Sequence, residues 1–422
     1  MTTQAERPLA LRHSIGDDSI LVVTLDVPGE RVNTLSRSLM VEFESLVAAL
    51  EGGFGVVGAV LTSGKPDGFI AGADIRDFTA IRSAREAEEL ARGAQALLDR
   101  LARLAMPVVA AIHGPCLGGG LEVALACRYR VASDDPRTVV GQPEVMLGLI
   151  PGAGGTQRLP RLAGLVTGLD LILTGRSLKA KRALKAGIVD EVVPEAILVE
   201  VARRAARQLA EGTLKPKRPG ISARERVLRP WIFRKAEATV REKSGGHYPA
   251  PYKAIEVIRE GTRRGLAEGL ALEARAFGEL AVTDVSRALV SVFFATQEIK
   301  KDIGVPEGTV ARPVRKLGVI GAGLMGSGIA GAAVEAGALV RLRDTSIEAV
   351  ARGLRQVREP LEERRQRGSL TAREVGQRLD RMSVTVDYSG FRRAELVIEA
   401  VFEDLEVKRQ VLAEVEAVTH ED

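Results

Sequence analysis

The hydrophobic positions of the first 160 residues fall into short apolar runs separated by longer segments with helical spacing. Four runs rich in Val, Ile, Leu and Ala predict β-strands, at residues 20–25, 58–62, 108–112 and 130–132. Two segments place apolar residues three or four positions apart, which predicts helices at residues 36–50 and 84–104. Strands that alternate with helices indicate an α/β layer fold.

The pattern changes after residue 160 and again near residue 310. Residues 161–210 have mostly helical spacing, and prolines with a Gly-Gly pair interrupt the stretch that follows. Helical spacing returns at residues 252–301, and the segment from Val305 to Pro313 predicts an irregular connection. We therefore expect a first domain, a helical basic linker and a third region, at residues 1–200, 201–310 and 311–422.

The composition is that of a globular protein, with 45% hydrophobic and 27% charged residues among 422. Cys116 and Cys127 are the only cysteines, so a disulfide framework is excluded and no zinc-binding spacing occurs. No apolar run reaches the roughly 18 residues of a membrane span, and the first 19 residues lack a signal-peptide core. We expect a cytoplasmic protein without a membrane span and without a metal.

The net charge of +5 is unevenly distributed, because basic residues clearly outnumber acidic ones between Arg203 and Lys243. Such a stretch is most often a solvated helical surface. It could also bind a polyanionic ligand such as CoA, or a partner subunit. Nucleic acid binding lacks the stacking aromatic residues it needs, since Trp231 and Phe233 stand nearly alone.

Two glycine-containing loops follow predicted strands in the first half. Ala71-Gly72-Ala73-Asp74 is one, and Gly118-Gly119-Gly120 leads into a predicted helix near Leu121. Glycine lets backbone N–H groups approach a ligand closely, and a helix N-terminus directs N–H donors at one point. Two such loops could stabilise a thioester oxygen that gains negative charge. Either loop alone is more often a structural turn.

Two glutamates lie near these loops in the sequence. Glu122 is in the first turn of the helix after the second loop, and Glu144 precedes a glycine-rich segment at residues 148–159. A single glutamate at a helix start usually interacts with the helix dipole. A pair of carboxylates beside an oxyanion hole can add water to a double bond, one taking a proton from water and the other moving the proton at the α-carbon.

Three segments together resemble the signatures of the enoyl-CoA hydratase (crotonase) superfamily, in order and in spacing. They are Phe69–Asp74, Gly118–Glu122 and Gln142–Arg158. The resemblance implies a crotonase-like ββα spiral domain that is usually oligomeric. It also implies site residues: Glu122 and Glu144 as catalytic carboxylates, the N–H groups of Ala71 and Gly119 as the oxyanion hole, and substrate-binding positions at Gly72, Ala73, Asp74 and Gly118. The presence of both glutamates favours hydration over other reactions of the superfamily.

A second motif begins at residue 316. Lys316–Ile320 predicts a strand, Gly321, Gly323 and Gly326 form G-x-G-x-x-G, and a second predicted strand ends at Asp344. This context is typical of a Rossmann unit, in which the glycines admit a pyrophosphate and the acid binds the ribose hydroxyls. Asp344 favours NAD over NADP.

The segment after the next predicted strand, 395–401, is similar to the 3-hydroxyacyl-CoA dehydrogenase family. The resemblance implies a partial Rossmann NAD-binding domain and a set of cofactor-binding residues, namely Gly321, Gly323, Leu324, Met325, Gly326, Asp344, Val401, Phe402, Glu403 and Lys408. An amphipathic surface helix that carries Lys408 is the alternative interpretation of this last segment.

The two halves in one chain resemble the α-subunit family of the bifunctional fatty-acid β-oxidation complex. That resemblance implies hydration of 2-trans-enoyl-CoA, oxidation of 3-hydroxyacyl-CoA with NAD, isomerisation of 3-enoyl-CoA in the hydratase site, and a thiolase β-subunit (acetyl-CoA acyltransferase) as partner. Two rival hypotheses are a non-catalytic acyl-CoA/NAD-binding scaffold and an RNA-binding crotonase-like protein.

We also expect the dehydrogenase part to be C-terminally truncated. Dehydrogenases of this family use a histidine oriented by a glutamate, and His420 near the end of the sequence lacks that context. The sequence therefore predicts weak NAD binding, an unpaired sheet edge and no NADH production by this chain. The hydratase part, in contrast, is expected to be complete before the linker.

Overall fold

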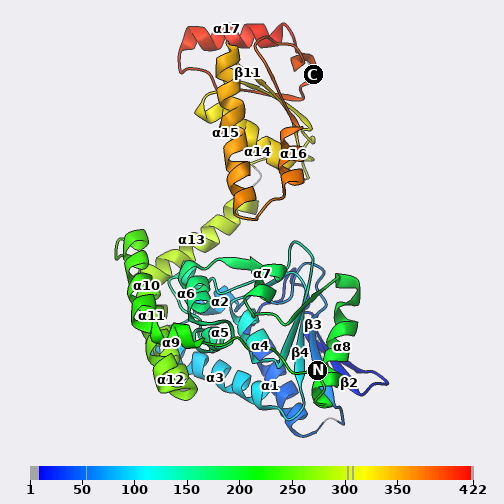
Figure 1. Ribbon diagram of the computed structural model, residues 1–422, viewed down its shortest axis with the longest axis vertical. Helices are drawn as coiled ribbons and strands as arrows, with labels where there is room; N and C mark the ends of the chain where they lie inside the picture. Colours follow the sequence, from blue (N-terminus) through cyan, green and yellow to red (C-terminus); the bar gives the residue numbers. More distant parts are fainter. Residues whose placement is uncertain (1–8, 54, 302–303, 307, 420–422) are drawn as a thin grey trace, which may run out of the picture. The chain divides into compact units, whose positions relative to one another are not determined.

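The structure is a computed structural model that describes residues 9–53, 55–301, 304–306 and 308–419. The chain forms two compact units, Met1–Ile303 and Gly304–Asp422 (Figure 1). His420 lies outside the described residues.

The first unit contains two sheets and the helices that cover them. Its strands are β1 (Leu11–Ile15), β2 (Ile20–Leu25), β3 (Gly58–Ser63), β4 (Val108–Ile112), β5 (Pro115–Leu117), β6 (Tyr129–Ser133), β7 (Val139–Gly141), β8 (Ser177–Lys179) and β9 (Glu191–Val193). Its helices are α1 (Arg37–Glu51), α2 (Ile75–Thr79), α3 (Ala84–Arg103), α4 (Gly119–Ala126), the 3-10 turn η1 (Glu144–Leu147), α5 (Gly155–Ala163), α6 (Leu165–Thr174), α7 (Ala180–Lys185), the 3-10 turn η2 (Glu195–Ile197), α8 (Leu198–Ala210), α9 (Ala223–Val227), α10 (Arg229–Ser244), α11 (Pro249–Arg264), α12 (Leu266–Ala281) and α13 (Asp284–Lys301).

The larger sheet has the strand order β1-β2-β3-β4-β6-β9, in which only the β1–β2 pair is antiparallel. Successive side chains point to opposite faces, so Leu21 and Val23 enter the main core while Ile20 enters a smaller one. Helix α8 covers the smaller core, and α1, α3 and α4 lie on the other side of the strands (Figure 1). Both faces of the parallel strands are thus buried, as parallel pairing requires. The smaller sheet, β5-β7-β8, carries the chain towards the glycine loop at residue 118.

The four predicted strands of this unit are present as β2, β3, β4 and β6, and the two predicted helices as α1 and α3. The short strands β5, β7, β8 and β9 escaped prediction because three residues are too few to establish a period.

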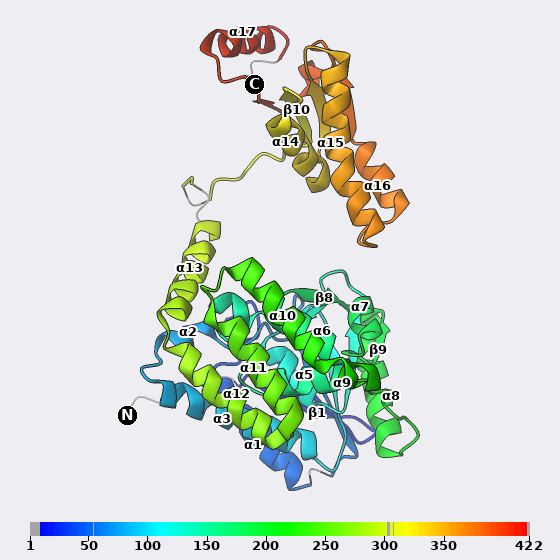
Figure 2. The same cartoon turned by 60° about the vertical axis from the view of Figure 1, so that its left-hand side comes forward.

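Residues 201–303 belong to the first unit and do not form a separate linker. Ile255 and Ile258 of α11 and Phe277 and Leu280 of α12 are buried in the same core as strands β2 to β4. Helix α12 lies close to α3, because a Cβ added to Gly278 would come within 2.4 Å of the backbone oxygen of α3's first residue. Figure 2 shows α10, α11 and α12 side by side over this part of the unit. The expected boundaries at residues 200 and 310 are therefore replaced by one near residue 303.

The second unit is a four-stranded parallel sheet of order β12-β11-β10-β13. Helices α14 and α15 cover one face, while Phe391 and α17 cover the other. The elements are β10 (Lys316–Ile320), α14 (Leu324–Ala336), β11 (Leu339–Arg343), α15 (Ile347–Gln366), α16 (Ala372–Leu379), β12 (Met382–Thr385), the 3-10 turn η3 (Phe391–Arg393), β13 (Leu396–Glu399) and α17 (Leu405–Glu416). This order, 3-2-1-4 in sequence, is that of a Rossmann half and confirms the predicted fold class.

None of the described helices in either unit is both long and apolar enough to span a lipid bilayer.

The packing of α11 and α12 leads to a prediction about chain length. A chain that ends at Ile303 should unfold cooperatively, whereas one that ends at Gly212 should not. The shorter chain loses several buried apolar side chains, each contributing about 1.5–3 kcal/mol, against a typical total stability of roughly 5–15 kcal/mol. Thermal unfolding followed by circular dichroism would measure this. Equal midpoints for the two chains would contradict it.

Candidate active site

The glycine run at the start of α4 lies in close contact with Ile70 and with the Glu144 side chain. Gly118 has a φ of +54°, which favours glycine, and a Cβ there would come within 2.9 Å of the Glu144 carboxylate. A Cβ on Gly120 would lie 2.3 Å from the Ile70 carbonyl oxygen. The run is therefore required by close packing, and it places the N-terminus of α4 against the Ala71–Asp74 loop.

Several backbone N–H groups of the two loops have no acceptor among the described hydrogen bonds, and those of Ala73 and Gly119 are two of them. In the expected pair, Ala71 was the first donor, but its N–H donates to the Asn33 carbonyl oxygen at 2.9 Å. Among the described hydrogen bonds neither Ala73 nor Gly119 donates its N–H. The two residues are neighbours, because a Cβ on Gly119 would lie 3.6 Å from the Ala73 nitrogen. The geometry thus replaces Ala71 by Ala73 as the available donor.

Asp74 and Gly72 shape this loop. The Asp74 side chain caps α2 by accepting from the Arg76 N–H at 2.9 Å, and the Arg76 guanidinium pairs with the same carboxylate at 2.7 Å. That hydrogen-bonded guanidinium lowers the pKa of Asp74. Gly72 has a φ of +120°. Asp74 is thus fully engaged as a helix cap, and its substrate-binding role remains a prediction.

Glu122 lies buried beneath the second loop. One of its carboxylate oxygens accepts from the N–H groups of Ala153 and Gly155, each at 2.7 Å. Burial raises the pKa of Glu122 to about 7, while the two N–H donors act in the opposite direction by stabilising the anion. A Cβ on Gly155 would come within 3.0 Å of the Glu122 carboxylate, so glycine keeps this contact open.

Glu144 begins η1 and faces the same region. With the Gln142 amide oriented so that its nitrogen faces the carboxylate, that nitrogen donates to both oxygens of Glu144, at 2.8 and 3.0 Å. Burial raises the pKa of Glu144 well above its ordinary value, and the charge of Glu122 raises it further. The structure therefore gathers the two predicted glutamates and both loops into one site.

A third glutamate, Glu273 of α12, escaped the sequence analysis. Its side chain is fully buried and accepts from the N–H groups of Gly154 at 2.6 Å and Thr156 at 2.9 Å. Burial raises the pKa of Glu273 to about 8, and the Glu122 charge adds to this. No motif marks the residue. A detectable signal was its position on the apolar face of α12, next to Leu270 and Ala274, where a carboxylate is unusual.

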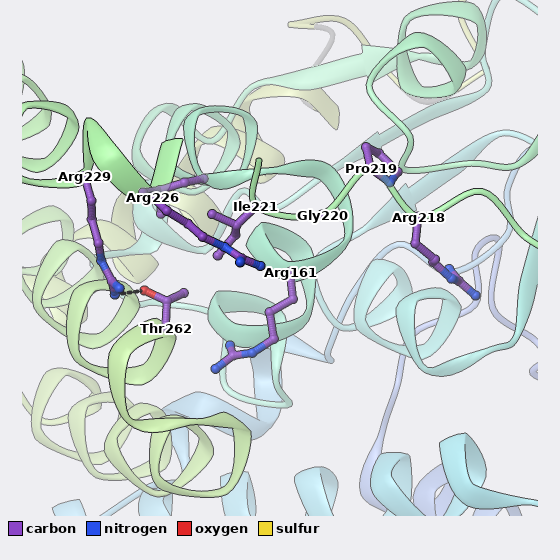
Figure 3. A pocket seen from close by; sticks show the side chains of 9 residues that line it. Arg161, Arg218, Pro219, Gly220, Ile221, Arg226, Arg229 and Thr262 are labelled. Carbon is purple, nitrogen blue, oxygen red and sulfur yellow. Dashed lines mark hydrogen bonds between the residues drawn. The ribbon is translucent and has the colours of Figure 1, made fainter. Parts of the chain in front are cut away.

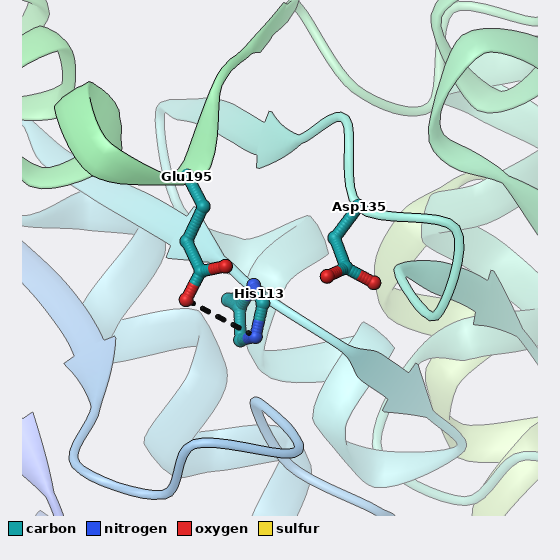
Figure 4. Close-up of side chains that lie close together, drawn as sticks. All are labelled: His113, Asp135 and Glu195. Atoms are coloured by element: carbon teal, nitrogen blue, oxygen red, sulfur yellow. Dashed lines mark ion pairs between the residues drawn. The ribbon is translucent and has the colours of Figure 1, made fainter.

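His113, Asp135 and Glu195 form the one group of potential metal ligands within the described residues (Figure 4). The Nε2 of His113 lies 2.8 Å from the Pro66 carbonyl oxygen, which can only accept, so this nitrogen carries the proton. The Nδ1 lies 3.1 Å from the Ser133 hydroxyl. Asp135 is paired with Arg137, which lowers the pKa of Asp135 to about 2. Both ring nitrogens are thus used in hydrogen bonds, one to Ser133 of β6 and the other to the loop after β3.

The glycines of the second unit have the three roles that a dinucleotide loop requires. Gly321 turns the chain with a φ of +98°. A Cβ on Gly326 would lie 1.7 Å from the Gly321 carbonyl oxygen, so only glycine lets α14 approach β10. Gly323, at the helix N-cap, has open space where its Cβ would be, which leaves the N–H groups accessible to a pyrophosphate. These residues fit a dinucleotide.

The other expected cofactor-binding residues lie at the carboxyl ends of β10, β11 and β13. Asp344 accepts from the Ala322 N–H at 2.7 Å and so joins the end of β11 to the glycine loop. Phe402 is 86% exposed after β13, and Leu324 and Met325 are exposed at the start of α14. Lys408 pairs with Glu399 at 2.6 Å and Glu403 at 3.4 Å. β10 lies between β11 and β13, which is the switch point where such sheets bind ligands.

Comparison with known proteins agrees with both sites. Residues 16–218 match the enoyl-CoA hydratase/isomerase family, and residues 316–422 match the NAD binding domain of 3-hydroxyacyl-CoA dehydrogenase. The fatty acid oxidation complex subunit alpha of Idiomarina loihiensis (strain ATCC BAA-735 / DSM 15497 / L2-TR) is 47% identical over 414 residues. The match covers 96% of this chain and 58% of that relative, so the chain spans less than two thirds of the relative's length.

Among solved structures, the enoyl-CoA hydratase from Bacillus halodurans superposes with a TM-score of 0.50 at 20% identity, covering 67% of this chain and all of that chain. This likeness shows the fold of the first unit. The chain thus joins an enoyl-CoA hydratase/isomerase domain to a 3-hydroxyacyl-CoA dehydrogenase NAD-binding domain, and it is a homologue of the fatty acid oxidation complex α-subunit.

Proposed function

We propose that the first unit hydrates 2-trans-enoyl-CoA to 3-hydroxyacyl-CoA. The observation that carries the proposal is the pairing of two carboxylates, the buried Glu122 and the half-buried Glu144, with the unused N–H groups of Ala73 and Gly119. The N–H pair would bind the thioester oxygen as it gains negative charge. Removal of one such donor typically lowers a rate by about 10²–10³.

The surroundings of the two carboxylates support different protonation states. Two backbone N–H groups stabilise Glu122 as an anion, whereas burial and the charge of Glu122 keep the proton on Glu144. Paired groups whose pKa values are pushed apart can serve as base and acid in one reaction. Glu122 is therefore the base and Glu144 the acid in the hydration direction.

Glu122 takes a proton from water as the water oxygen bonds to C3, and the double-bond electrons move to the thioester oxygen at the Ala73 and Gly119 N–H groups. The enolate collapses as Glu144 gives its proton to C2. One water is added, and exchange with solvent returns a proton from Glu122 to Glu144. Isomerisation of 3-enoyl-CoA would use Glu144 alone, removing a proton at C2 and returning it at C4.

The acyl chain has a suitable cavity next to these groups. A cavity of about 490 Å³ is lined mainly by apolar residues of α2, α12 and α13 and by Leu149. Leu149 donates its N–H to the Glu144 carbonyl oxygen, and α2 directly follows the Ala71–Asp74 loop. We propose that the acyl tail enters this cavity between Leu149 and α2.

For the second unit we propose NAD binding in a 3-hydroxyacyl-CoA dehydrogenase role. Bound NAD accepts a hydride in such enzymes. The Gly321–Gly326 loop would hold its pyrophosphate, Asp344 its ribose, and the residues near Phe402 and Lys408 its nicotinamide end. The relative's name, a complex subunit, supports a further proposal of a cytoplasmic assembly with a thiolase β-subunit.

Replacement of the paired glutamates tests the hydratase proposal. Glu144→Gln and Glu122→Gln should each lower kcat for crotonyl-CoA hydration by about 10²–10⁴, because each removes one acid–base group. The loss of absorbance at the enoyl-thioester band measures the rate. Glu195→Gln, which changes an exposed glutamate of the same unit, should retain the wild-type rate. Wild-type rates in both site variants would refute the assignment of Glu122 and Glu144 as the acid–base groups. Absence of turnover by the wild type would refute the proposed function.

Cofactor preference tests the second unit. Asp344 should repel a 2′-phosphate, so the wild type should bind NADH more tightly than NADPH, and Asp344→Ala should reduce the difference. Titration of nicotinamide fluorescence gives both dissociation constants. Asp380→Ala, at the exposed end of α16, should leave the preference unchanged. Equal affinities in the wild type would rule the assignment out.

A further inference from the structure

Four consecutive backbone N–H groups are shared alternately between two buried carboxylates. Ala153 and Gly155 donate to Glu122, while Gly154 and Thr156 donate to Glu273. Gly155 begins α5, so the first turn of this helix is fixed from two sides. Shifting one carboxylate would move the N–H groups that hold the other.

Side-chain donors also hold Glu273 in place. The Thr156 hydroxyl donates to it, and so does the amide of Gln95, a buried residue of α3, at 3.0 Å. The same amide nitrogen lies 3.0 Å from the Gly152 carbonyl oxygen. Burial of a carboxylate is costly unless hydrogen-bond donors compensate for its lost hydration. These donors are therefore what allows Glu273 to lie in the core.

We infer that Glu273 is a positioning residue for the hydration site, holding the 153–156 turn so that Glu122 faces the water. The inference rests on the proposed hydratase function. Glu273 lies beyond the enoyl-CoA hydratase/isomerase match at residues 16–218, so the helices after that match complete the site. The expectation that the hydratase part is complete before residue 201 is therefore wrong.

The charge of Glu273 also affects the pKa of Glu144. The negative charge of Glu273 raises the pKa of Glu144, so its removal should lower that pKa. The positive groups that act on this cluster are on α5: Arg158, whose charge opposes the rise in the pKa of Glu122, and Arg161, whose pKa burial lowers while the charge of Glu273 opposes that shift. Both remain in a Glu273 variant. Glu144 would then lose its proton at lower pH. Because the rate falls when Glu144 is deprotonated, the alkaline limb of the pH–rate profile would also shift to lower pH.

Glu273→Gln tests the inference in the full chain. It should lower kcat for crotonyl-CoA by about 10²-fold, as a small displacement of a reacting group does, with little change in KM and an alkaline limb moved to lower pH. Glu273→Asp, which keeps the charge, should restore the wild-type position of that limb while kcat stays low. Glu279→Gln, on the exposed side of the same helix, should leave both kcat and the profile unchanged.

The outcomes separate this inference from the proposed function. An inactive wild type would refute the hydratase proposal itself. An active wild type with a folded Glu273→Gln variant of unchanged kcat and unchanged profile would overturn only the positioning role. If Glu273→Gln fails to fold, Thr156→Val removes one donor to Glu273 and should still lower kcat without raising KM. An unaffected Thr156→Val variant would then overturn the role.

A different observation carries a second proposal. A cavity of about 580 Å³ lies between α5, α9, α10 and α11 and is lined by Arg161, Arg226 and Arg229, with Arg218 on its rim. Figure 3 shows the first three converging on one space, while Arg218 points away. Within the described part of the chain, none of the four guanidiniums has a carboxylate partner within salt-bridge distance.

Two of these arginines are held in place by neutral groups. Arg161 donates to the Gly261 carbonyl oxygen at 2.7 Å, and Arg229 donates to the Arg259 carbonyl oxygen at 2.6 Å and to the Thr262 hydroxyl. Carbonyl oxygens orient a guanidinium without neutralising it. The acids whose charges act on Arg161 and Arg229 are engaged elsewhere: Glu273 accepts from the Gly154 and Thr156 N–H groups, and Glu260 pairs with Arg263 and Arg264.

We propose that this cavity binds a diphosphate group of a small phosphorylated ligand. Three converging guanidiniums match an anion of charge −2 or more, and guanidinium binds phosphate oxygens through paired N–H donors. The site accounts for part of the basic stretch at residues 203–243. Other residues of that stretch form surface ion pairs, such as Arg203 with Asp18.

Calorimetric titration of the full chain with inorganic pyrophosphate tests this site. Arg226→Ala should weaken binding about tenfold or more, since it removes charge-assisted hydrogen bonds, whereas Arg224→Ala on the same short helix should not. A parallel titration with ADP identifies the source of the group: tighter, Arg226-dependent binding indicates a nucleotide, and equal binding indicates free diphosphate. Absence of binding, or equal effects of the two variants, would overturn the proposal.

Discussion

The hydrogen bonds from the turn at residues 153–156 to two buried carboxylates are the constraint on which the first unit depends. Each carboxylate alone would be expensive to bury, because a charge loses its hydration in the protein interior. Alternating N–H donors at the start of α5 offset that loss for Glu122 and Glu273 together. The turn can adopt this shape because Gly154 has a φ of +109° and because Gly155 leaves space for the Glu122 side chain.

This arrangement connects the three glutamates of the site to the packing of distant segments. Glu122 comes from α4, Glu144 from η1 and Glu273 from α12, so three elements that are separate in the sequence supply these side chains. Helix α12 reaches the site because small residues let it lie against α3, and Gln95 of α3 then binds both Glu273 and the loop. Burial of α12 and the placement of Glu273 against the 153–156 turn are therefore one structural requirement.

The sequence was sufficient for the parts of the molecule that depend on local pattern. Strands β2, β3, β4, β6, β10 and β11 follow from runs of apolar residues, and the glycine loops and both glutamates follow from motifs. Ala71 was misassigned because motif reading cannot tell which N–H group in a loop is already bonded. That depends on Asn33, far away in sequence, whose carbonyl oxygen accepts from Ala71. Glu273 was missed for a related reason: its partners are backbone N–H groups in a turn that forms only after the chain has folded.

In both units the N-termini of helices supply backbone N–H donors. A neighbouring side chain determines which group these N–H donors can bind. At α5 the N–H groups are occupied by two of the protein's own carboxylates, so that turn fixes Glu122 and Glu273 in place. At α4 the Gly119 N–H stays open because no acceptor in the described structure reaches it, which suits an oxygen that becomes charged only during reaction. At α14 the space beside Gly323 is open and Asp344 is bonded to Ala322, one residue away. A carboxylate at the position of Asp344 repels a 2′-phosphate on the ribose but leaves the pyrophosphate position accessible. One carboxylate beside the start of one helix can therefore select NAD over NADP.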